Sequence, residues 1–261
     1  MTAIRTYDVD LAAGRASVRE AGEGEPVGFL AGLGGVPTWL PFLDELARRR
    51  RVVVPSLPGF PGSSVDFHQL DDHLDWLTAT LDLLDAAGLS GADLIASSVA
   101  GMLAADIAAL SPALVRRLVL ISPWGLYDPS QPGRDYFAEV PDLQPGLLSV
   151  QPERLAEAMA PPPGVDPVDS RVAAYRASEA AARLSWPMGD RGLRKRQHRI
   201  TQRTLLLWGE QDIIVPPSYA DQFAAAIRGP VEVAIVPEAG HLCVVDQPTI
   251  AAKHVLAFLE S

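Results

Sequence analysis

The chain has 261 residues, 48% of them hydrophobic and 21% charged, which is typical of one sizeable globular domain with an insertion, or of two small domains at most. Its formal net charge of -10 argues against nucleic acid and anionic membrane as partners, because both are bound through basic surfaces. The single cysteine, Cys243, excludes an internal disulfide and is compatible with a reducing compartment.

The amino-terminal residues do not resemble a targeting signal. Asp8 and Asp10 make this segment polar, so we expect no signal peptide. No apolar run approaches the roughly 18 residues that a membrane-spanning helix needs. We therefore expect a cytoplasmic protein without a membrane partner.

The first half of the chain predicts alternating strands and helices. Two short strands around Ala13 and Gly14 are expected to form an antiparallel hairpin. Hydrophobic residues then recur at the spacing of buried strands and of amphipathic helices in turn. The expected strands are residues 4–9, 15–20, 27–31, 51–55, 92–96 and 117–121, and the expected helices are residues 38–49, 70–87 and 99–110.

The pattern changes at Ser122-Pro123 and resumes near residue 204. Between these points no buried strand is apparent, and many prolines separate three helical stretches. The helical stretches are residues 153–159, 172–184 and 192–199. After them we expect strands at 204–208 and 231–236 and helices at 218–227 and 249–260.

This order of elements predicts an α/β fold with a mostly parallel central sheet and helices on both faces. Residues 1–122 and 204–261 are expected to form the core. Residues 123–203 are expected to form a helical lid, inserted before the strand that precedes Asp212.

A serine lies where the strand 92–96 turns sharply into a helix. Such a reversal brings the positions two before and two after its apex close together, so only small side chains fit there. With Ser98 at the apex, both positions are alanines. With Ser97 at the apex they would be Ile95 and Val99, whose β-branched side chains would collide. We therefore predict Ser98 as the apex, with its hydroxyl above the edge of the sheet at a helix N-terminus that favours negative charge.

Two further groups follow strands of the predicted sheet, where ligands bind in open parallel sheets. Asp212 follows the strand 204–208, and His241 follows the strand 231–236. His241 is suited to take the proton of Ser98 and return it to a leaving group. A buried Asp212 would fix the imidazole tautomer. We predict these three residues as a catalytic set, with Asp128, after the strand before the lid, as the alternative acid.

Backbone amides are expected to stabilise the oxyanion of this reaction. The N–H of Val99, at the start of the helix, is one predicted donor, and the N–H of Leu33, in the loop Gly32-Leu33-Gly34-Gly35, is the second. Glycines in this loop let the main chain approach the substrate closely. No metal and no cofactor is needed for this chemistry, and we expect neither.

Substrate contacts are less constrained by the sequence. Aromatic residues of the insertion are expected either to line an apolar pocket or to form the insertion's own core. They are Trp124, Tyr127, Tyr136, Phe137 and Trp186, accompanied by Met188. The candidate substrate contacts are Gly34, Trp124, Tyr127, Trp186 and Leu242.

A basic cluster stands out in this acidic chain. Its members are Arg191, Arg194, Lys195, Arg196 and Arg199. We interpret it as a solvated face that offsets nearby acidic residues. The alternative is a contact to an anionic substrate.

Together these segments resemble the α/β-hydrolase family over nearly the whole chain. Residues 30–35 are similar to its His-Gly oxyanion loop, and residues 55–64 to its Asp-x-x-Gly-x-Gly-x-Ser loop. The similar segments that carry the acid and the base are 206–212 with 215–216, and 239–241. The chain departs from the family at Ala31 and Ser56, which removes hydrogen bonds from the oxyanion loop, and has Ala96 and Ala100 where glycine is commonest.

The resemblance implies a serine hydrolase that cleaves a small carboxylic ester or related acyl substrate through an acyl-enzyme on Ser98. The first alternative is a carbon–carbon bond hydrolase of the meta-cleavage type. Such enzymes usually carry Asn before the nucleophile and Trp after the histidine, where this chain has Ser97 and Leu242. A perhydrolase or a lyase would keep the same triad. Relatives with an aspartate nucleophile are disfavoured by the serine at the apex.

A second alternative, from a different class, is a non-catalytic ligand-binding protein on the same fold. This alternative predicts the loss of at least one triad member, and none is missing. The expected partner is a small molecule. The sequence leaves its identity and the oligomeric state of the protein open.

Overall fold

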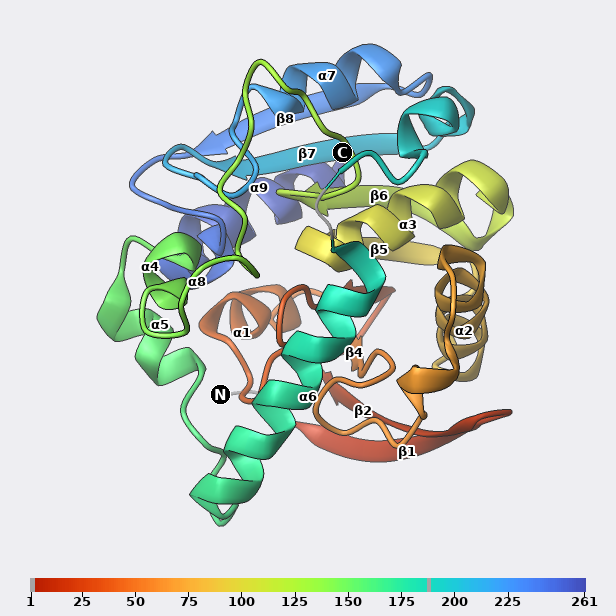
Figure 1. The fold of residues 1–261 in the computed structure, drawn as a ribbon. Helices are drawn as coiled ribbons and strands as arrows, with labels where there is room; N and C mark the ends of the chain where they lie inside the picture. Colours follow the sequence, from red (N-terminus) through yellow and green to blue (C-terminus); the bar gives the residue numbers. More distant parts are fainter. Residues whose placement is uncertain (1–2, 187–188) are drawn as a thin grey trace.

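An eight-stranded sheet forms the centre of the computed structural model, which describes residues 3–186 and 189–261 (Figure 1). The strands lie in the order β1-β2-β4-β3-β5-β6-β7-β8. Among the strands that the structure describes, only the pairs β1–β2 and β2–β4 are antiparallel, so the predicted mostly parallel sheet is confirmed. The strands are β1 (Arg5–Leu11), β2 (Gly14–Ala21), β3 (Pro26–Leu30), β4 (Arg51–Pro55), β5 (Ala92–Ser97), β6 (Val115–Ile121), β7 (Arg203–Gly209) and β8 (Val231–Val236).

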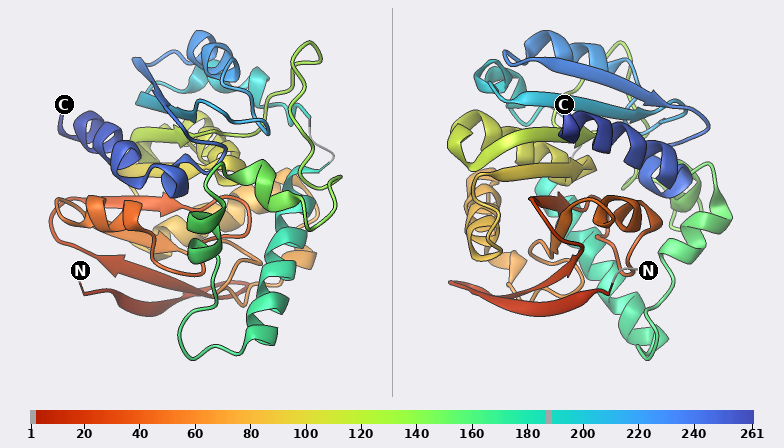
Figure 2. Two further views of the ribbon diagram at one scale, coloured as in Figure 1. Left: turned by 90° about the vertical axis from the view of Figure 1, so that its left-hand side faces the viewer. Right: turned by 180° about the vertical axis from the view of Figure 1, so that it is seen from behind.

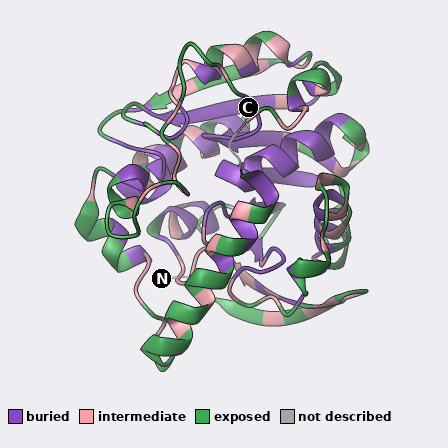
Figure 3. Ribbon diagram, viewed as in Figure 1, coloured by how far each residue is buried: buried purple, intermediate pink, exposed green. Residues whose placement is uncertain are grey.

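Helices cover both faces of the sheet. On one face α1 (Pro41–Ala47) packs against α9 (Pro248–Glu260), and on the other α2 (His73–Ala86) packs against α3 (Ser98–Leu110) (Figure 2). A further helix, α7 (Tyr219–Ala226), packs against β7 and β8. Because both faces are covered, the central strands are mostly apolar, and every residue of β5 is buried (Figure 3).

The segment between β6 and β7 is helical, as predicted, but its details differ from the prediction. It holds α4 (Gln144–Leu148), α5 (Pro152–Ala158) and α6 (Pro167–Ser185). The last of these starts earlier than predicted, because Asp166 accepts the Val168 N–H and a proline occupies the first turn. The stretch 192–199 forms two 3₁₀ turns and no α-helix, after Gly192 in the left-handed conformation. The assignment of this segment as a separate lid stays a prediction.

The register of the strands brings the loops after β3, β5, β6 and β7 to one edge of the sheet. Leu30 pairs with Ala96, and Ser97 pairs with Ile121, which in turn pairs with Leu207. The chain segments that follow these strands therefore lie side by side. In Figure 1 the insertion passes this edge beside the short helix α8 (Cys243–Asp246), against which α5 packs. Within the described residues, no helix combines the length and apolar character needed to cross a membrane.

Candidate active site

Ser98 occupies the sharp turn between β5 and α3. Its φ of 55° lies in the left-handed region, whereas Ser97 is extended with a φ of -114°. The flanking Ala96 and Ala100 are fully buried, so no room is left there for a larger side chain. Such backbone strain at a buried serine between a strand and a helix is typical of a nucleophile turn.

The glycine-rich loop after β3 approaches this turn so closely that only glycine fits at position 32. A Cβ on Gly32 would lie 2.5 Å from the Ser98 Cβ and 2.7 Å from the Ser97 carbonyl oxygen. The Gly32 N–H donates to the Ser97 hydroxyl at 2.9 Å. Ser97 thus ties the loop to the turn, a role that the sequence pattern did not indicate.

We expect Gly32→Ala to lower kcat for ester hydrolysis by about 100-fold, because the added methyl group must displace the predicted oxyanion donor beside it. The matched control is Gly146→Ala in α4, where an added Cβ has no heavy atom within 4 Å. Steady-state kinetics of both purified variants provide the measurement. A Gly32→Ala enzyme with the wild-type kcat would contradict the predicted close approach.

His241 links Ser98 to Asp212 in one hydrogen-bonded chain. Its Nε2 lies 2.8 Å from the Ser98 Oγ, and its Nδ1 lies 2.9 Å from Asp212 Oδ2. The other carboxylate oxygen of Asp212 accepts the N–H groups of Ile214 and Val215, both at 3.0 Å. All three side chains are 3% exposed or less. The structure therefore brings together the three residues proposed from the sequence.

Trp124, in the loop that follows β6, contacts the same imidazole. Its indole N–H points at His241 Nε2 at 3.4 Å, and its backbone N–H donates to the Ser98 carbonyl oxygen at 3.1 Å. Since an indole nitrogen only donates, Nε2 must be the unprotonated nitrogen. The Nδ1 proton then points to Asp212, which is the tautomer that a general base needs.

The loop that carries Leu33 lacks the hydrogen bonds that the usual family residues at positions 31 and 56 would make. Other contacts hold it in place. The Gly35 N–H donates to the Gly32 carbonyl at 2.8 Å and closes the turn. From β2, the Arg19 guanidinium donates to the carbonyl oxygens of Val36 and Pro37. Burial lowers the pKa of Arg19.

A cavity of about 630 Å³ adjoins this loop. Leu33, Gly34, Pro37 and Pro61 line it from the core, and the insertion contributes largely apolar residues, most of them from α4, α5 and α6. Asp169 is the single charged residue that lines it among the described residues. Tyr136 also lines this cavity and packs edge-on against Phe137, which packs against Trp124.

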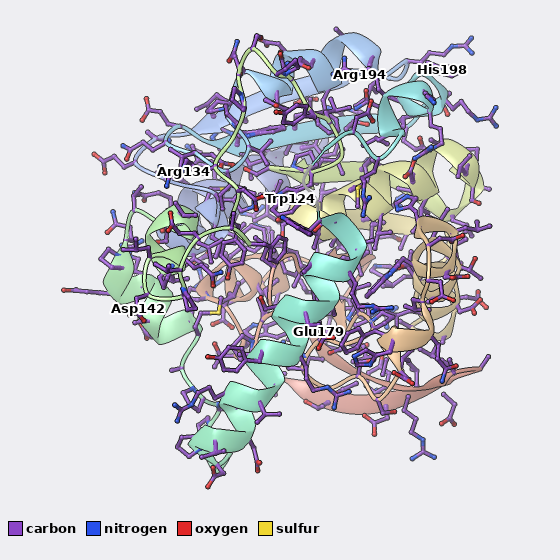
Figure 4. All side chains as sticks on the ribbon, in the orientation of Figure 1. Trp124, Arg134, Asp142, Glu179, Arg194 and His198 are labelled. Carbon is purple, nitrogen blue, oxygen red and sulfur yellow. The ribbon has the colours of Figure 1, made fainter. Side chains whose placement is uncertain are left out.

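A second cavity has a volume of about 190 Å³. Trp124 and Tyr127 line it together with Asp135. Figure 4 shows Trp124 near the centre of the molecule, between α6 and the edge of the sheet. No Lys or Arg lines either cavity in the part of the chain that the structure describes.

Two candidate substrate contacts lie elsewhere. The side chain of Trp186 is half exposed, and its indole N–H donates to Asp135 at 3.0 Å. Leu242 is buried, and its N–H donates to the Leu148 carbonyl at 2.8 Å. Neither residue lines one of the two cavities. Met188 lies outside the described residues.

Asp128 is not placed to orient the imidazole. Its carboxylate accepts the N–H and the hydroxyl of Ser130 and the side-chain amide of Gln222. The hydrogen bonds from Ser130 lower the pKa of Asp128. Asp128 therefore belongs to a surface turn beside α7, and Asp212 is the acid in contact with His241.

The basic cluster has partners away from both cavities. Arg196 forms two hydrogen bonds, at 2.6 and 2.9 Å, with the buried Asp106 of α3. Arg199 donates to the Ala109 carbonyl, and Arg194 donates to Gln222. Figure 4 places Arg194 at the outer edge of the molecule, far from Trp124. This placement favours the interpretation of the cluster as a structural and solvated face.

Cys243, the first residue of α8, follows the histidine loop and is fully buried. Burial, followed by the charges of Asp212 and Asp246, raises the pKa of this thiol far above its ordinary value. It therefore acts as a small hydrophobic residue. Within the described residues, no group of three His, Cys, Asp or Glu side chains could hold a metal ion.

Known proteins resemble this chain over most of its length. It is 28% identical over 271 residues to epoxide hydrolase 4 of Mus musculus, in an alignment that covers 92% of this chain and 75% of that protein. It is 29% identical over 227 residues to 2-hydroxy-6-oxo-2,4-heptadienoate hydrolase of Pseudomonas putida. This alignment covers 77% of this chain and 76% of that protein. A solved membrane phospholipase A, described as a bacterial virulence factor, matches with a TM-score of 0.74 and 25% identity over 98% of this chain and 86% of that one.

The sequence model of the α/β hydrolase fold matches residues 25–248. This range contains the strained serine turn and both of its hydrogen-bonded partners. Together with the hydrolase relatives and the geometry of the triad, it identifies the protein as an enzyme of the hydrolase type. The chain belongs to the α/β hydrolase family.

Proposed function

We propose that the protein is a serine hydrolase that cleaves a carboxylic ester or related acyl substrate through an acyl-enzyme on Ser98. The observation that carries this proposal is the continuous hydrogen-bonded chain from Ser98 through His241 to Asp212. The backbone N–H groups of Leu33 and Val99 are the proposed oxyanion donors. Residues 123–203 are the proposed lid over this site.

Each step of the reaction has a group to perform it. His241 Nε2 takes the hydroxyl proton as Ser98 Oγ attacks the acyl carbon, and the oxyanion forms beside the two backbone donors. Collapse of this intermediate expels the alcohol, which receives the proton from Nε2. Water then attacks the acyl-enzyme with His241 again as the base, and the acid product leaves Ser98 free.

The lining of the cavities favours a neutral apolar substrate. The larger cavity is bounded by Leu33 of the oxyanion loop and is mostly apolar, and its charged lining residue is Asp169. The smaller cavity also carries an acidic residue, Asp135. A substrate carboxylate in either cavity would lose its water without gaining a cationic partner there. The similarity to a membrane phospholipase A supports an ester as the reacting group.

The second candidate is a carbon–carbon bond hydrolase. It is supported by the similarity to 2-hydroxy-6-oxo-2,4-heptadienoate hydrolase, whose printed substrate is a dienoate. Ser97 and Leu242 differ from the residues usual in such enzymes, and among the described residues neither of the two cavities beside Leu33 and Trp124 has a Lys or Arg for a carboxylate. The similarity to epoxide hydrolase 4 carries no epoxide substrate to this chain, because Ser98 stands where epoxide hydrolases of this fold have aspartate. The net charge of -10 and the single cysteine support a small-molecule partner and a cytoplasmic location.

We expect p-nitrophenyl hexanoate to be hydrolysed with a kcat/KM at least roughly tenfold above that of mono-p-nitrophenyl adipate, because only the second ester buries a carboxylate. A fluorophosphonate probe should also label Ser98, as peptide mass spectrometry can show. Faster cleavage of the adipate ester would contradict the expected preference for an uncharged acyl group, and cleavage of a dienoate would favour the carbon–carbon bond hydrolase. Folded protein that is not labelled at Ser98 would favour the non-catalytic alternative.

A further inference from the structure

A second buried carboxylate lies beside the histidine loop and has no part in the triad. Asp246, the last residue of α8, is fully buried. One of its carboxylate oxygens accepts the N–H of Gly240 at 2.7 Å and the N–H of Val150 at 3.2 Å. The other accepts the hydroxyl of Ser149. Three donors from two distant segments therefore meet on one carboxylate, which is well suited to accept them all.

These contacts join the insertion to the loop that carries the base. Ser149 and Val150 follow α4 in the insertion, whereas Gly240 directly precedes His241. A second link is made on the other side of the histidine, where the Leu242 N–H donates to the Leu148 carbonyl at 2.8 Å. The backbone is thus held to the insertion immediately before and immediately after His241.

The same part of the insertion forms a wall of the larger cavity. Leu148 lines that cavity, and its carbonyl is the acceptor for Leu242. Figure 1 shows α4 and α5 beside α8, and α5 packs against α8. The cavity wall and the histidine loop therefore form one hydrogen-bonded unit.

His241 needs this support because its ring must meet two partners at once. The imidazole lies 2.8 Å from the Ser98 oxygen and 2.9 Å from the Asp212 oxygen. Asp212 orients the ring, but it does not fix the backbone that carries the ring. A displacement of about 1 Å at a reacting group costs on the order of 100-fold in rate.

We infer that Asp246 is a positioning residue that locks the backbone of Gly240 and His241 onto residues 148–150 of the insertion. The placement of the base then depends on the cavity wall. This inference rests on the proposed function, because it assigns to His241 the role of general base.

Two substitutions test the lock from its two sides. Asp246→Asn keeps the shape of the side chain but removes its charge and places a donor where the Ser149 hydroxyl now donates. The hydroxyl must then turn to accept, and the bonds from the backbone N–H groups lose their charge assistance. Ser149→Ala removes the hydroxyl that donates to Asp246 and that accepts the Gln151 N–H, and it leaves the bonds from Val150 and Gly240 in place. The matched controls are Asp106→Asn, a buried carboxylate bonded to His73 and Arg196, and Thr80→Val, a buried hydroxyl bonded to the Trp76 carbonyl.

Hydrolysis of p-nitrophenyl acetate and hexanoate and the rate of fluorophosphonate labelling are measured for each folded variant. We expect Asp246→Asn to lower kcat by roughly 10- to 100-fold and Ser149→Ala by roughly threefold to tenfold, with KM changed little, because misplacement of the base affects the chemical step. Labelling should slow by similar factors, since it uses the same base without filling the larger cavity. The two controls should keep kcat within about twofold even where their melting temperature falls.

Three outcomes would overturn the inference. The first is a wild-type kcat and labelling rate in Asp246→Asn and Ser149→Ala. The second is slower hexanoate hydrolysis with unchanged labelling, which would assign Asp246 to the cavity wall alone. In both cases hydrolysis by the wild type would leave the proposed function intact. If the wild type neither hydrolyses the esters nor is labelled, the proposed function and the inference both fail. If Asp246→Asn does not fold, Ser149→Ala decides the matter.

Discussion

Ser98→Ala is expected to lower kcat for p-nitrophenyl hexanoate hydrolysis by about 10⁵- to 10⁶-fold, the largest effect of any single substitution in this protein. The Ser98 hydroxyl is the one that touches His241 Nε2 among the described residues. The side chain is buried, and alanine adds no bulk at this position because only the hydroxyl is removed. The small residual rate would come from the oxyanion donors and from substrate binding.

The adjacent serine provides a control for this prediction. Ser97 differs from Ser98 by one position, and its hydroxyl accepts the Gly32 N–H instead of contacting the imidazole. Ser97→Ala should therefore lower kcat only about tenfold, through loss of one hydrogen bond that holds the oxyanion loop. Rates from prolonged incubation with each variant provide the measurement. Two results would contradict the assignment. One is an equal loss of kcat in the two variants, and the other is a residual activity above 1% in Ser98→Ala, roughly a thousandfold more than expected.

The serine turn could be predicted from the sequence because its constraint is local. A strand that reverses into a helix must have small residues beside the apex, and the choice between Ser97 and Ser98 depends only on four neighbours. The alternation of strands and helices likewise follows from the spacing of apolar residues along the chain. The same alternation places Asp212 and His241 at one edge of the sheet, where the two side chains are in contact.

The substrate region could not be predicted in the same way because it is built from distant segments. The larger cavity exists where α4, α5 and α6 pack over Leu33 and Gly34, and no periodicity encodes that packing. The contact of Ser149 with Asp246 joins residues 97 positions apart. Trp186 is aromatic like Trp124, yet it lies at the surface, because its indole is paired with Asp135.

The basic cluster shows the same limit. Its charge is visible in the sequence, but its partner is a buried aspartate of α3, 90 positions before Arg196. Burial of Asp106 opposes its ionisation, and the hydrogen bonds from His73 and Arg196 outweigh this, so its pKa is lowered. A charge cluster thus acquires its role from the partner that the fold provides.

Asp212→Asn is expected to lower kcat by roughly 10⁴-fold, because it reverses the tautomer of His241. Asp212 Oδ1 accepts two backbone N–H groups, from Ile214 and Val215, so an amide at this position must keep its oxygen there. Its NH₂ group then faces His241 Nδ1, which has to become the acceptor. The imidazole proton then moves to Nε2. This nitrogen can no longer accept the proton of Ser98, and its own N–H faces the indole N–H of Trp124.

Asp128→Asn separates this prediction from the alternative acid. Asp128 is bonded to Ser130 and Gln222 at the surface, so its substitution should leave kcat within about twofold. Both variants are measured at neutral pH with the same ester, and labelling of Ser98 should slow in Asp212→Asn alone. A large loss in Asp128→Asn with little change in Asp212→Asn would mean that the carboxylate after β6 serves the base in solution. The buried contact between Asp212 and His241 predicts the opposite result, since removing that carboxylate leaves the imidazolium of the reaction without a counter-charge.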